Sequence, residues 1–171
     1  ANLFGFQLVV LMSAIHFGIG DAAFISEIDS RSTKSSFPKI PYALAAGFTP
    51  VLIPLVNQQS AEALRAVNPA LIGWAGVFES FLYFGMISIA VIAISWMLIR
   101  KRFDNAFDLG LLLVISLTAP PLVAFAFYFG LWHALRHTGR LSLELPSSVR
   151  AHNSNQTLKA FWSSVNAGLP A

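Results

Sequence analysis

The sequence contains no cysteine and few charged residues. Of its 171 residues, 11% are Asp, Glu, Lys or Arg, whereas 56% are apolar. The absence of cysteine excludes a disulfide framework, a thiolate metal site and a catalytic thiol. A water-soluble domain of this length could not hide so much apolar surface. We therefore predict an all-α, polytopic integral membrane helical bundle with about five or six spanning or broken helices.

The sequence also lacks the features of a signal peptide. No basic region precedes its first apolar run, and no small-residue cleavage site follows that run. The chain begins at Ala1 rather than at a methionine, and it ends at Ala171 within another apolar stretch. We expect a single membrane-embedded domain over residues 1–171 that is a fragment, lacking residues at both ends.

Apolar runs predict where the helices lie. A spanning helix needs about 20 residues, and the predicted segments cover residues 2–20, 42–56, 70–99, 107–119 and 121–138, with a sixth starting near 156. Proline removes a backbone donor and kinks a helix, so Pro50 and Pro54 predict a broken or re-entrant second segment. The pair Pro120-Pro121 predicts a sharp break. Polar loops are expected at residues 21–41, 57–69 and 141–157.

Basic residues predict the orientation of these segments. Lys and Arg accumulate in the cytoplasmic loops of membrane proteins, and Arg100, Lys101 and Arg102 end the third segment. Alternation from there places the 21–41 loop and the end of the 121–138 segment on the same side. The protein is therefore expected to be a multi-pass protein of the cell (cytoplasmic) membrane. Because the net charge of +3 lies in short loops, no nucleic-acid partner is expected.

Three of the four histidines are candidate metal ligands. His133 and His137 are four residues apart on one predicted helix, so they share a face and could bind one metal ion. His16 is predicted at the same membrane depth. Each could instead anchor its helix at the interface or bond a terminal carbonyl. Imidazole ligands suit iron, copper or zinc. The fourth histidine, His152, is expected to be a surface residue.

Other residues could support such a site. A carboxylate can orient a ligand imidazole. Asp21 is poorly spaced to reach His16, five residues before it, so it would more plausibly serve a histidine of another helix. Its alternative role is a helix N-cap. Phe125 and Phe129 precede the histidine pair by four-residue steps, which predicts an aromatic channel for a long hydrophobic substrate. The alternative is that these rings only pack or lie at the interface.

Three motifs carry a resemblance to a known family. Residues 128–137, YFGLWHALRH, closely resemble the YF..WHS.RH signature of the Brp/Blh family of bacterial and archaeal β-carotene 15,15'-dioxygenases. Residues 16–21, HFGIGD, look like its HFG..D motif. Residues 46–55, AGFTPVLIPL, are similar to its R-G-x-x-P-x-x-x-P-L stretch, with Ala46 in place of the arginine. The motifs occur in the family's order and span roughly residues 10–140.

The resemblance implies an integral-membrane, non-haem iron oxidoreductase. Such an enzyme uses dioxygen to split the central double bond of β-carotene into two retinals, which usually serve a rhodopsin. By carry-over, His16, His133 and His137 would bind Fe(2+), with Asp21 as a supporting residue. The family also has an upstream histidine in a G-x-x-H-G-x-x-D motif, and this chain has no counterpart of it.

Other functions compete with this one. A non-catalytic carotenoid- or retinal-binding membrane protein would need the same apolar helices, and a haem-binding helix pair could use His16 with one histidine of the pair. A desaturase or hydroxylase with histidine boxes needs more histidines than the four present. A transporter would explain broken helices, but the sequence shows no charged residue near mid-membrane.

Overall fold

The computed structural model describes residues 2–30, 37–57, 60–69 and 72–168 of this chain. All regular elements of this described part are helical, which confirms the predicted all-α class. Three helices are long and apolar enough to cross a membrane: Leu3–Asp29, Lys39–Val56 and Gly76–Ile99. The chain forms two compact units, Ala1–Tyr128 and Phe129–Ala171. The single domain expected over residues 1–171 stays a prediction.

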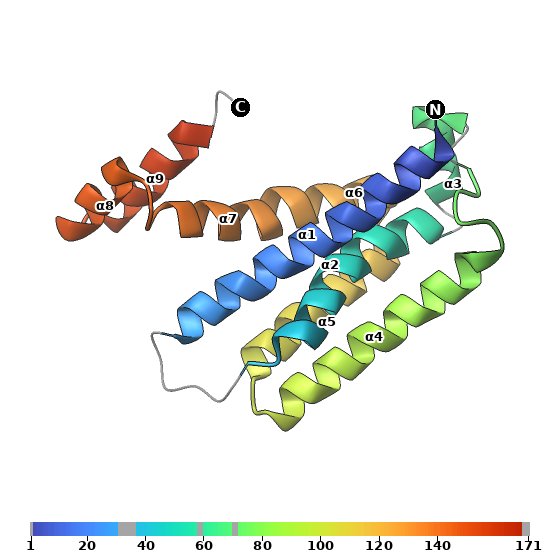
Figure 1. Ribbon diagram of the computed structural model, residues 1–171, viewed down its shortest axis with the longest axis horizontal. Helices are drawn as coiled ribbons and strands as arrows, with labels where there is room; N and C mark the ends of the chain where they lie inside the picture. Colours follow the sequence, from blue (N-terminus) through green and yellow to red (C-terminus); the bar gives the residue numbers. More distant parts are fainter. Residues whose placement is uncertain (1, 31–36, 58–59, 70–71, 169–171) are drawn as a thin grey trace. The chain divides into compact units, whose positions relative to one another are not determined.

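The first unit is a helical bundle around one central helix (Figure 1). Its elements are α1 (Leu3–Asp29), α2 (Lys39–Val56), α3 (Ser60–Val67), the 3₁₀ turn η2 (Gly76–Phe78), α4 (Glu79–Ile99), α5 (Phe103–Thr118) and α6 (Pro121–Ala126). The central helix is α2, which packs against α1, α4, α5 and α6. The π-helical segment η3 (Phe127–His133) then leads into the second unit, which contains α7 (Ala134–Leu141), α8 (Pro146–Asn153) and α9 (Thr157–Gly168).

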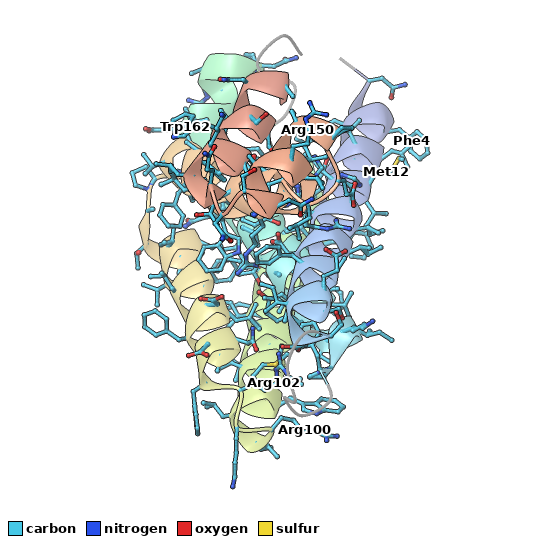
Figure 2. The ribbon with its side chains drawn as sticks, turned by 90° about the vertical axis from the view of Figure 1, so that its left-hand side faces the viewer. Phe4, Met12, Arg100, Arg102, Arg150 and Trp162 are labelled. Atoms are coloured by element: carbon cyan, nitrogen blue, oxygen red, sulfur yellow. The ribbon has the colours of Figure 1, made fainter. Side chains whose placement is uncertain are left out.

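The first unit exposes many large apolar side chains, and several of its closest helix contacts are made by small residues. Phe4 and Met12 project outward from α1 (Figure 2), whereas the buried positions of the same helix include Ala14, Gly18 and Ala22. Lipid tails are as apolar as leucine, so helices in membranes gain little from burying large side chains and associate through small ones. This distribution of residues matches a bundle that is surrounded by lipid.

The second segment is not broken, contrary to our prediction. Residues Lys39–Val56 form one helix that contains Pro50 and Pro54 in its interior. Each proline deprives the carbonyl four residues earlier of its helical donor. Both prolines are nevertheless buried, because α2 has neighbours on several sides. Packing against those neighbours keeps the helix continuous despite the missing hydrogen bonds.

The polar stretches predicted as loops are largely helical. Helix α1 continues to Asp29 and α2 begins at Lys39, so the predicted loop 21–41 is wrong at both ends; residues 31–36 lie outside the described residues. The predicted loops 57–69 and 141–157 contain α3 and α8. In contrast, the long third segment begins as an α-helix only at Glu79. The predicted break at Pro120 is confirmed, because α5 ends at Thr118 and α6 begins at Pro121.

Arg102 joins the end of α1 to the turn between α4 and α5. It is 5% exposed, and its guanidinium lies 2.5 Å from the carboxylate of Asp29. It also donates to Asn105 Oδ1 at 2.9 Å and lies over the ring of Phe37. Such charge-assisted bonds are stronger than neutral ones. The contact places the ends of α1 and α4 together, as the orientation argument requires, while Arg100 stays exposed (Figure 2).

Trp74 connects the start of α1 to the end of α2, at the other end of the bundle from Arg102. Its indole N–H donates to the carbonyl oxygen of Leu55 at 3.0 Å, and its own carbonyl accepts from the side chain of Gln7 at 2.8 Å. The bond to Leu55 satisfies one of the carbonyls that every helix leaves unpaired at its C-terminus. The bundle is therefore held at both ends by specific polar contacts.

Candidate functional site

Gly18 and Gly47 bring the first two motifs into backbone contact. A Cβ atom on Gly18 would lie 2.0 Å from the carbonyl oxygen of Ala43, and one on Gly47 would lie 2.0 Å from that of Ala14. Both distances are far below van der Waals contact. Only glycine therefore allows α1 and α2 to approach this closely. The motif at residues 16–21 thus packs directly on the motif at 46–55.

Asp21 lies inside α1 and forms a hydrogen bond with a tyrosine of the third motif. Its side chain is 1% exposed, and its Oδ2 accepts a hydrogen bond of 3.2 Å from the hydroxyl of Tyr128, which is 0% exposed. The ring of Phe17 meets the Tyr128 ring edge to face, with centroids 6.1 Å apart. The N-cap alternative for Asp21 is therefore wrong. Whether Asp21 also orients an imidazole stays a prediction.

Tyr128 is a site residue that the sequence argument missed. It opens the third motif, but the sequence argument gave it no polar role. Its hydroxyl was the available signal, because a buried tyrosine needs a partner for its O–H group. We call Phe17, Gly18, Asp21, Gly47 and Tyr128 the motif cluster. It contains residues of all three motifs and lies entirely within the first unit.

His133 and His137 lie side by side in the second unit. Their ring centroids are 6.3 Å apart, and the ring planes differ by 10°. His133 is half-buried and His137 is exposed. The prediction that they share a helix face is confirmed. Imidazoles are common metal ligands, and the assignment of this pair as ligands stays a prediction.

The segment before this pair is π-helical, which sequence periodicity did not predict. Residues Phe127–His133 form η3, and the hydrogen bonds of a π-helix connect residues five apart rather than four. The four-residue steps that placed Phe125 and Phe129 on the face of His133 therefore do not apply through this segment. Both rings are half-buried, and their role as a substrate channel stays a prediction. Short π-helical segments occur frequently at functional sites.

His16 lies on α1 in the first unit. It is exposed, and its ring meets that of Phe17 edge to face at 5.4 Å. Within the described part of the chain, no group of three or more His, Asp or Glu side chains is assembled for a metal ion. The structure thus brings together His133 with His137, and Asp21 with Tyr128. The three-histidine ligand set stays a prediction.

Comparison with known proteins agrees with the three motifs. A sequence profile described as β-carotene 15,15'-dioxygenase matches residues 2–170. The chain belongs to this family. A β-carotene 15,15'-dioxygenase from uncultured marine bacterium 66A03 is 30% identical over 138 residues, which cover 78% of this chain and 46% of that relative. This member of the dioxygenase family therefore spans less than half the length of the relative it matches. No solved structure matches the chain significantly.

Loss of the Tyr128 hydroxyl is expected to destabilise this dioxygenase-family chain. In Tyr128→Phe the Asp21 carboxylate stays buried but loses a donor, which costs about 1–3 kcal/mol. Tyr83→Phe in α4, where the tyrosine is half-buried, is the matched control and should change stability by less than about 0.5 kcal/mol. Unfolding in mixed detergent micelles measures both. Equal stability of the two variants would show that the Asp21–Tyr128 bond contributes nothing.

Proposed function

We propose that the protein containing this chain is a membrane oxygenase that cleaves the central double bond of β-carotene. One carbon–carbon double bond breaks, and each resulting carbonyl takes one atom of O2, so that two retinals form. The observation that carries the proposal is the motif cluster. Three family motifs, distant in sequence, meet at Gly18–Gly47 and Asp21–Tyr128, and the third motif also bears the His133–His137 pair.

The residues proposed to hold Fe(2+) are His16, His133 and His137. When bound, iron(II) would supply the activation of dioxygen. The imidazoles of His133 and His137 lie on one face with ring centroids 6.3 Å apart, and rotation of the two side chains would aim both at one metal ion. In this proposal Asp21 and Tyr128 hold α1 to the start of the histidine-bearing motif, and the ligands therefore depend on them for position.

The membrane supplies the substrate in this proposal. β-Carotene dissolves in the hydrocarbon core, and the first unit exposes large apolar side chains over its helices. A polyene could enter laterally along Phe125 and Phe129, and an apolar passage would keep water from reactive oxygen species. The retinal produced in the cell membrane would be available to a rhodopsin.

Co-expression in a bacterium that makes β-carotene tests this function. The chain as printed is compared with the longest open reading frame that contains it, and retinal and residual β-carotene are measured by chromatography. We expect two retinals for each carotene consumed with the longer protein. Since the chain spans 46% of its relative, little or no retinal is expected from the chain alone. Intact carotene in both cultures would contradict cleavage and favour a protein that only binds polyenes.

A further inference from the structure

The second unit carries the whole net charge of the chain. Its charged residues are Arg136, Arg140, Glu144, Arg150 and Lys159, which give the formal +3 of the complete sequence. Basic and acidic residues therefore balance in the first unit. Lysine and arginine near a membrane are attracted to anionic headgroups. The charge thus distinguishes the second unit from the membrane-spanning one.

Helices α8 and α9 form a hairpin. Helix α8 contains 8 residues, far fewer than the about 20 that a span needs, and α9 (Thr157–Gly168) mixes apolar residues with several polar ones, Lys159 among them. The two helices pack through small residues, with a buried 2.9 Å hydrogen bond between the hydroxyls of Ser148 and Ser164. Asn155 makes the turn in a left-handed conformation, at φ 56°.

The outward face of α9 combines large apolar side chains with a lysine. Leu158 is 70% exposed and Trp162, one turn later, is 54% exposed. Lys159 is exposed beside them, and Arg150 is exposed on α8; Trp162 and Arg150 are labelled in Figure 2. Helices that lie in a membrane interface show this composition, with tryptophan and leucine toward the lipid and basic residues toward the headgroups.

We propose that the α8–α9 hairpin lies in the interface of an anionic lipid leaflet. Leu158 and Trp162 insert at the boundary between headgroups and acyl chains, and Arg150 and Lys159 contact the anionic headgroups. The charge of the unit selects anionic over zwitterionic lipid. The first unit, with its candidate spans, keeps the hairpin close to a bilayer, so that a weak interfacial affinity suffices. This inference does not depend on the proposed oxygenase activity.

Site-directed spin labelling of the full chain tests the proposal, because the protein has no native cysteine. Leu158→Cys and Trp162→Cys are compared with the exposed control Asn153→Cys, after reconstitution in phosphatidylcholine vesicles with or without phosphatidylglycerol. With phosphatidylglycerol, we expect labels at 158 and 162 to be accessible to oxygen but protected from a water-soluble nickel chelate. The label at 153 should be open to nickel.

A charge variant tests the role of the headgroups. The double variant Arg150→Gln, Lys159→Gln should shift the label at 162 out of the lipid. In anionic vesicles, the ratio of the lipid-inserted population of this label to its water-exposed population should fall about 30-fold. Arg65→Gln, an exposed control in the first unit, should leave this ratio unchanged. Equal protection with and without phosphatidylglycerol would overturn the anionic preference. Nickel access at 158 and 162 equal to that at 153 would place the face in water. Labels shielded from both reagents would show that protein covers it. Either of these last two results overturns the proposal.

Discussion

Iron binding is expected to fall to background in both His133→Ala and His137→Ala of the longest protein containing this chain. The two rings lie on one face with centroids 6.3 Å apart, so each variant removes one of the two adjacent imidazoles that we propose as ligands. Loss of a group that only supports a ligand costs about 10–100-fold in metal affinity, and we expect loss of a ligand to exceed about 100-fold. Metal analysis of purified protein and titration with iron(II) measure this directly, and retinal formation should disappear with the metal.

His152→Ala is the matched control for these variants. His152 also belongs to the second unit, where its Nε2 lies 3.4 Å from the hydroxyl of Ser142, and it is not a proposed ligand. Its iron content should equal that of the unchanged protein. Equal iron in all three variants would show that the ligands lie elsewhere. His16→Ala separates the remaining possibilities, because retained iron in that variant would leave the pair as ligands and remove His16 from the set.

The sequence predicted which segments are helical better than where they end. Hydropathy located α1, but the charged residues after Gly20 indicated a loop. Two of those residues are accommodated in the helix by distant partners: Asp21 by Tyr128 and Asp29 by Arg102. Local composition does not show a partner that lies over seventy residues away. Helix ends that depend on such contacts were therefore placed too early.

The continuity of α2 also depends on tertiary structure. Pro50 and Pro54 correctly predicted missing backbone hydrogen bonds, and the error was to infer a broken segment from them. Burial of both prolines among neighbouring helices outweighs the local cost. In contrast, the helix before Pro120-Pro121 did end. Proline fits the first turn of a helix but not its interior, so Pro121 begins α6 and cannot continue α5.

The candidate site was predictable where its geometry is local. A spacing of four residues placed His133 beside His137. The bond between Asp21 and Tyr128 joins residues that are 107 apart in sequence, and no periodicity indicates it. The π-helical hydrogen bonds of Phe127–His133 were likewise not predicted from the sequence. The motifs identified the family, while the structure showed that they pack on one another.

Gly18→Ala and Gly47→Ala are expected to be strongly destabilising. In each variant the added Cβ atom would lie 2.0 Å from a backbone carbonyl oxygen of the facing helix. A backbone atom cannot move aside as a flexible side chain can, so α1 and α2 must separate. Overpacking of this kind costs about 1–3 kcal/mol and sometimes more. Since α1 also carries Asp21, the separation should weaken the Asp21–Tyr128 bond, and iron binding should decrease as well.

Gly85→Ala and Gly110→Ala are the matched controls. Both glycines lie within helices, and a Cβ atom at either position would meet nothing within 4 Å. Alanine is the better helix former by up to about 1 kcal/mol, so these variants should be as stable as the unchanged protein or more stable. Unfolding by dodecyl sulfate in mixed micelles, followed by circular dichroism, compares all four. If Gly18→Ala and Gly47→Ala unfold at the same detergent fraction as the controls, α1 and α2 do not pack in backbone contact, and the motif cluster has a different arrangement.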